Sequence, residues 1–120
     1  MPPRRSRPDE EEDASLQGLG LAVTQLREDL GLSREAAVKR AGLTVPTITG
    51  IEKAKTREPR WGTLHRLAKA LEVPVNELVA LGLHLAPGPA GDRLRQRERE
   101  ARPIEIEALV AKAEKEAGQA

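Results

Sequence analysis

Residues 32–61, LSREAAVKRAGLTVPTITGIEKAKTREPRW, constrain the fold more than any other stretch, because they predict two short helices joined by a tight turn. Ser33 is a good helix N-cap, and Glu35 follows in the first turn, where the helix dipole favours a carboxylate. Gly42 should end this helix, since glycine adopts the left-handed backbone of a helix exit without strain. We therefore expect a helix at about residues 34–41 and a reversal of the chain directly after it.

A second helix should begin just after this turn. Thr44 is placed to cap it, and Pro46 falls in its first turn, where a missing N–H removes no helical hydrogen bond. Ile48 and Ile51 lie three residues apart and should face the core. The other face is then left for a partner, and we expect it to carry Val45, Thr47, Thr49 and Lys53.

Positive charge is concentrated directly after this second helix. The whole chain carries a net charge of only +1, but residues 14–85 alone carry 10 basic and 7 acidic groups. Four of these cations, Lys53, Lys55, Arg57 and Arg60, fall within eight residues that contain one acidic residue, Glu58. Such a loop is either an ordinary solvated segment or an edge that contacts phosphates.

The remaining pattern is entirely helical. Apolar residues recur at spacings of three and four from Leu16 to Leu30, again from Trp61 to Leu71, and once more after Pro74, and no stretch alternates as a strand would. The chain has no cysteine, so disulfides and thiolate metal sites are excluded. No apolar run approaches the roughly 20 residues that cross a bilayer, which predicts a cytoplasmic protein without membrane contact.

Composition divides the chain into four parts. Residues 1–13 have too few apolar groups to offset ordering entropy and predict a disordered tail, whereas 14–85 predict a compact helical domain. Residues 86–91, APGPAG, predict a linker, and 92–120 a charged helical extension. A helix of about 14 residues is marginal alone, so its apolar stripe should dock on its own domain, a second copy or another protein. This partner stripe consists of Ile106, Leu109, Val110 and Ala113.

Residues 19–82 carry a family pattern that continues past the turn. Gly42, Ile48, Ile51 and Glu52 are followed by K-x-R-x-P-R at 55–60 and by Leu64, Leu67, Ala68 and Leu71. In these positions the chain resembles the Cro/C1-type (XRE family) helix-turn-helix DNA-binding domain of phage repressors and many bacterial regulators. The resemblance implies an all-α, five-helix lambda-repressor-like DNA-binding bundle, here with a flexible N-terminal tail and a C-terminal helical extension. It also implies a homodimer on double-stranded DNA.

The resemblance assigns roles to particular residues. An ion pair between Arg27 and Glu52 should tie the first helix to the recognition helix, and Arg60 should approach the minor groove. The positions nearest the bases should be Val45, Pro46, Thr47, Thr49, Gly50 and Lys53. Those that hold phosphates should be Arg34, Thr44, Lys55 and Arg57. Family members commonly place polar side chains where Val45, Pro46 and Gly50 stand, so we expect weak or shape-dependent base reading.

Two functions follow from these observations. The first is a sequence-directed DNA-binding transcriptional regulator, acting as a repressor. The second is a protein-interaction module on a helix-turn-helix scaffold, such as an antitoxin or accessory factor whose C-terminal helix binds a partner. We expect no enzyme, because His65 and His84 lack accompanying ligands or nucleophiles. No catalytic residue, metal site or cofactor is therefore predicted.

Overall fold

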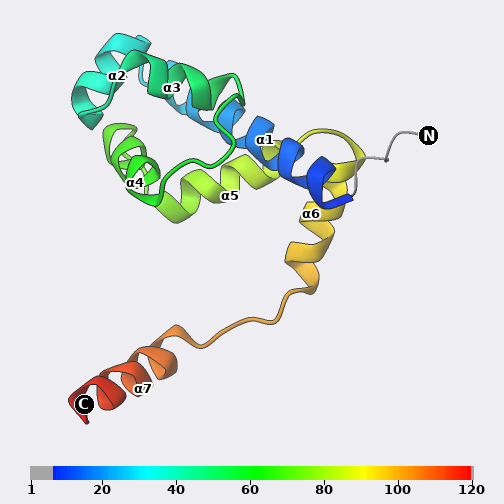
Figure 1. Cartoon of the computed structure of the whole chain (residues 1–120), viewed down its shortest axis with the longest axis vertical. Helices are drawn as coiled ribbons and strands as arrows, with labels where there is room; N and C mark the ends of the chain where they lie inside the picture. Colours follow the sequence, from blue (N-terminus) through cyan, green and yellow to red (C-terminus); the bar gives the residue numbers. More distant parts are fainter. Residues whose placement is uncertain (1–6, 120) are drawn as a thin grey trace.

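The computed structural model describes residues 7–119, and this part of the chain is helical throughout, with no strand (Figure 1). Its elements are α1 (Arg7–Asp29), α2 (Arg34–Ala41), α3 (Val45–Glu52), α4 (Trp61–Ala70), α5 (Val75–Leu85), α6 (Gly88–Glu100) and α7 (Ile106–Gly118). Within residues 7–119, none of these helices is long and apolar enough to cross a membrane. The prediction of an all-α chain is confirmed for the described residues.

Local capping positions α2 and α3 as the sequence predicts. The Ser33 hydroxyl accepts a hydrogen bond from the Ala36 N–H at 3.0 Å, and Gly42 ends α2 with a φ of 68°. Thr44 caps α3 by accepting from the Thr47 N–H, and Pro46 occupies the first turn. Because these contacts span no more than four residues, the turn between the two helices is specified locally.

The core lies among α1 to α5. Ile48 and Ile51 of α3 pack in one cluster with Leu67 and Leu71 around α4 and with Leu78 of α5, and each is at most 2% exposed. Burial of such a side chain contributes about 1.5 to 3 kcal/mol relative to exposure. The inner side of α3 is therefore held by aliphatic packing, which fixes the direction of its outer side.

Two glycines of α1 allow the helices to cross closely. A Cβ at Gly18 would overlap the Gly82 carbonyl oxygen of α5, and a Cβ at Gly20 would meet the carbonyls of Ile51 and Glu52 at the end of α3. Only hydrogen in place of a side chain permits these approaches. Gly18 and Gly20 therefore set how α3 and α5 lie against α1.

The N-terminal boundary differs from the sequence prediction. Residues 7–13 form the first two turns of α1 and are not a disordered tail, while residues 1–6 of that predicted tail lie outside the described part. Glu11 is buried and accepts two hydrogen bonds from Arg97 of α6, at 2.7 and 2.8 Å. Arg93 pairs with Glu10 at 2.9 Å. The acidic residues are ordered by cations more than 80 positions away in the chain.

The predicted linker at 86–91 is also wrong in part, because α6 already begins at Gly88. Arg95 fixes this helix by donating to the carbonyls of Leu83, His84 and Ala86 at the end of α5. A cation is favourable at a helix C-terminus, where carbonyls have no helical partner. In Figure 1, α6 accordingly lies against the beginning of α1 and the end of α5.

The C-terminal helix lies apart from the bundle. Residues 101–105 carry no helix and lead to α7, which Figure 1 shows well away from α1 to α5. Every residue from 101 to 119 is exposed. The predicted extension at 92–120 therefore consists of one helix that is docked and one that is not.

Candidate nucleic-acid interface

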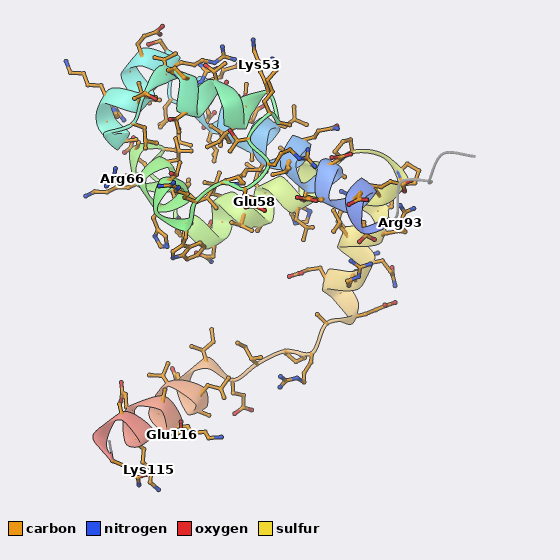
Figure 2. All side chains as sticks on the ribbon, viewed as in Figure 1. Lys53, Glu58, Arg66, Arg93, Lys115 and Glu116 are labelled. Atoms are coloured by element: carbon orange, nitrogen blue, oxygen red, sulfur yellow. The ribbon has the colours of Figure 1, made fainter. Side chains whose placement is uncertain are left out.

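The outer face of α3 is narrower than the sequence predicts. Pro46 and Lys53 are exposed and Thr49 is partly exposed, and their spacing of three and four residues places them on one side of the helix. Figure 2 shows Lys53 pointing away from the bundle at the end of α3. These three residues, which we call the α3 outer face, can meet a partner directly.

Three residues predicted to lie near the bases have other contacts. Val45 is partly buried and packs against the core cluster, so its placement on the outer face is wrong. The Thr47 hydroxyl lies 2.9 Å from that of Thr44. Gly50 lies against Thr56, whose hydroxyl oxygen would be 2.5 Å from an added Cβ. The helical periodicity could not show the Gly50 contact, because it depends on how the following loop folds back.

The loop that follows α3 is hydrogen-bonded to the last turn of that helix. The Gly50 carbonyl accepts from the N–H groups of both Lys55 and Thr56, at 2.8 and 3.1 Å, and Ala54 takes a left-handed φ of 57°. These bonds hold residues 53–56 against the end of α3. Lys53, Lys55, Arg57 and Arg60 are all exposed on this loop, so the α3 outer face continues into a cationic loop.

An ion-pair cluster fixes α3 to α1 and α2. Arg27 of α1 donates to both carboxylate oxygens of Glu52, at 2.8 and 3.0 Å, and also to the Leu32 carbonyl at 2.9 Å. Arg34 at the start of α2 donates to Glu52 at 3.1 Å. The structure thus brings Arg27 and Glu52 together as the resemblance implies. It also adds Arg34, which we expected only to hold phosphate.

The Glu52 carboxylate remains ionised in this cluster. Its side chain is 1% exposed, and this burial by itself raises the pKa of Glu52. Hydrogen bonds from Arg27 and Arg34, together with the positive charge of Arg27, outweigh burial, so the pKa of Glu52 is lowered overall. The same pair raises the pKa of Arg27. Both partners are therefore charged at neutral pH, and the cluster acts as a fixed support beneath the α3 outer face.

Arg57 has an intramolecular partner that the sequence did not reveal. Its guanidinium donates to Asp13 of α1 at 2.5 Å and lies 4.0 Å from Glu12. The Arg57 side chain is nevertheless 49% exposed. A phosphate that binds Arg57 must therefore compete with the acidic start of α1. Only the spatial position of residues 7–13, which we expected to be disordered, could have predicted this contact.

The arginines of α6 are used within the chain. Arg93 and Arg97 pair with Glu10 and Glu11 of α1, and Arg95 binds the end of α5. Arg93 lies beside the beginning of α1 in Figure 2. These three cations stabilise the docking of α6, whereas the exposed cations of the 53–60 loop adjoin the α3 outer face.

The fold and this surface define a helix-turn-helix protein of the DNA-binding class, in which α2 and α3 form the paired helices. A family model described as a helix-turn-helix domain matches residues 19–81, slightly more than half of the chain. The chain belongs to this helix-turn-helix domain family. Comparison with curated proteins and with solved structures returned no match.

Proposed function

We propose that this chain is a sequence-directed DNA-binding transcriptional regulator of the Cro/C1 type that acts as a repressor by occupying promoter DNA. The observation that carries the proposal is the α3 outer face, Pro46, Thr49 and Lys53, lying beside the cationic 53–60 loop. An α-helix fits the major groove of B-DNA, and flanking cations then meet the phosphates. The core packing of Ile48 and Ile51 presents that face outward.

Phosphate contacts supply most of the affinity in this proposal. Lys55 and Arg57 meet the backbone, and the N–H groups at the starts of α2 and α3 add partial positive charge. Arg34 contributes in part, because its Nε is bonded to Glu52 while its side chain is 35% exposed. Thr44 lies exposed at the α3 cap, where its hydroxyl also faces Thr47.

Base reading is restricted to a few groups. The Thr49 hydroxyl and the Lys53 ammonium can hydrogen-bond to base edges, and Pro46 can contact a thymine methyl group. Arg60 is proposed to enter the minor groove, where A·T-rich DNA is narrow and strongly negative. Specificity should therefore depend on DNA shape as much as on direct hydrogen bonds.

A homodimer on a two-fold site completes the proposal. One small module contacts a short stretch of DNA, whereas two copies read half-sites about 34 to 36 Å apart. Dimerisation also doubles the number of phosphate contacts and steepens the dependence of binding on salt.

Fluorescence anisotropy with the full chain tests this function. Labelled duplexes carrying the chain's own promoter, a shuffled sequence and an A·T-rich centre should be compared at low and high salt. Arg57→Ala should weaken binding to all duplexes alike, whereas Arg60→Ala should weaken binding to the A·T-rich centre most. Arg66→Ala is the control, because Arg66 lies on α4 away from Lys53 in Figure 2. If Arg66→Ala loses as much affinity as Arg57→Ala, the proposed surface is wrong.

A second function is favoured by α7. Its apolar stripe is exposed along its length, as the partner-binding helix of an antitoxin or accessory factor would be. Truncation after Arg102 removes α7 and keeps α6, whose Arg97 is needed by the buried Glu11. If this variant keeps DNA binding and loses a protein partner, α7 serves protein interaction. If the full chain binds no DNA at any salt concentration, the interaction module is the primary function.

A further inference from the structure

Large apolar side chains are exposed at several places in the described part of the chain, including Leu21 and Leu30 at α1. Four lie on the C-terminal segment, namely Ile104, Ile106, Leu109 and Val110, with exposed fractions from 48% to 65%. Two others, Trp61 on α4 and Val79 on α5, are 65% and 47% exposed. Exposed apolar groups that cluster in this way mark surfaces that contact another apolar surface.

Val79 lines an apolar groove on the bundle. The groove has a volume of about 250 Å³ and lies between α1, α4 and α5, and its walls are mainly aliphatic. They include Leu16, Leu19, Leu64, Val79 and Leu83. Trp61 is exposed at the start of α4, three residues before Leu64, and its indole packs edge-on against His65. An aliphatic groove that opens at the surface can bury apolar side chains of a partner.

The α7 helix has the complementary surface. Ile106, Leu109, Val110 and Ala113 recur at spacings of three, one and three, so they form one stripe along about two turns, or roughly 11 Å. No residue of α7 is buried. A helix of this length is marginal in water by itself, so this stripe needs a surface on which to pack.

We propose that two copies of the chain exchange their α7 helices, each stripe docking in the apolar groove of the other copy. The anchoring of α6 by Glu11 and Arg95 fixes the direction in which the chain leaves the bundle. Residues 101–105 then carry α7 away from its own bundle, as Figure 1 shows, and its own groove stays open.

Exchange in a symmetric pair covers both exposed surfaces of each chain at once. The contact is the same in both directions, so the assembly closes at two copies and leaves no free groove or stripe. This arrangement deepens the homodimer of the proposed function. Its test contains no DNA, so it can fail while the DNA-binding proposal stands, and the reverse also holds.

Cross-linking identifies the occupant of the groove, because the chain has no cysteine of its own. Full-length Val79→Cys and a longer, tagged Leu109→Cys chain should be mixed and treated with a short bis-maleimide. We expect a covalent product with the summed mass of the two chains. The matched control is Ala108→Cys on the opposite side of α7, which should give much less of this product.

The double variant Val79→Cys with Leu109→Cys separates exchange from folding back. A cross-link within one chain at low concentration would show that each α7 occupies its own groove and would overturn the proposal. If no cross-link between positions 79 and 109 forms in either experiment, the groove does not hold α7. That result would also overturn the proposed exchange.

Sedimentation provides the second readout. Leu109→Glu and Val79→Glu should each weaken self-association at least about tenfold, because either change places a charge in an apolar contact. Ala108→Glu and Ala80→Glu add the same charge away from the stripe and the groove and should leave self-association unchanged. Leu109 is 50% exposed and α7 has no buried residue, so Leu109→Glu tests association without unfolding the bundle. An unchanged mass for Leu109→Glu, or a wild-type chain that stays monomeric at high concentration, contradicts exchange.

Discussion

Substitution of Arg27 by methionine should unfold the bundle more readily than any surface charge change. Methionine keeps the length of the side chain but removes both hydrogen bonds to Glu52 and the bond to the Leu32 carbonyl. The Glu52 side chain is 1% exposed, so its charge cannot be solvated instead. The substitution therefore leaves a buried carboxylate with Arg34 as its remaining arginine partner.

The size of the effect follows from this burial. Removal of one partner from a buried ion pair typically costs about 3 to 5 kcal/mol. Because Arg34 still donates to Glu52, we expect the lower end, about 3 kcal/mol. For a bundle of this size, that corresponds to a fall in melting temperature of roughly 12 to 24 °C.

Thermal and urea unfolding followed by circular dichroism at neutral pH measures this loss. Arg66→Met is the control, because Arg66 is exposed on α4 and its loss should change stability by no more than about 0.5 kcal/mol. The double variant Arg27→Met with Glu52→Gln should recover part of the loss, since it removes the stranded charge while still lacking the Leu32 bond. Equal melting temperatures for Arg27→Met and Arg66→Met would refute the reasoning.

Three further predictions test the packing, the pH dependence and the acidic start of α1. Gly18→Ala should destabilise the bundle by about 1 to 3 kcal/mol in urea unfolding, because its methyl group would overlap the Gly82 carbonyl. The control Gly62→Ala, in the open part of α4, should be neutral or stabilising. Similar losses of stability for both variants would contradict the close approach of Gly18 to Gly82. The fold lowers the pKa of Glu52 below its value in the unfolded chain, which is about 4.3. Ionised Glu52 therefore contributes its full stabilisation above that pH, and the stabilisation is lost as the pH falls through the pKa of Glu52 in the folded state. The melting temperature should therefore fall at acid pH, and less steeply for Glu52→Gln; parallel pH profiles would contradict the assignment. Asp13→Asn should strengthen DNA binding by up to about fivefold at low salt, because Arg57 is then free to bind phosphate. The same substitution should have no effect on DNA binding in an Arg57→Ala background. An equal gain in affinity in both backgrounds would indicate a general charge effect and contradict the role of Arg57.

Helix capping and apolar periodicity were sufficient to predict the structure where the interacting groups are close in sequence. Ser33, Gly42 and Thr44 act as predicted, because a capping hydrogen bond joins residues three or four apart. The apolar spacing around Ile48 and Ile51 likewise predicts the buried side of α3. The turn between α2 and α3 could therefore be read from the sequence alone.

Contacts between distant parts of the chain could not be predicted in the same way. Glu11 is held by Arg97, which lies 86 residues later in the chain. Composition alone therefore predicted that the acidic residues before position 14 belong to a disordered tail. The approach of Gly18 to Gly82 has no local signature either, since a helical glycine is ordinarily only a weak helix former. Val45 was placed on the outer face because the pattern shows periodicity but not how tightly the first turn of α3 packs.

An NMR titration of the isotope-labelled full chain with a short duplex tests the central claim most directly. If α3 and its cationic loop bind DNA, the amide signals of residues 33–36, 44–50 and 53–60 should shift together and saturably. Those of α6, whose arginines are engaged within the chain, should change little. The shifts should weaken as salt is raised, since phosphate contacts carry the affinity. Shifts confined to α6 and α7, with none at α3 or residues 53–60, would contradict the account.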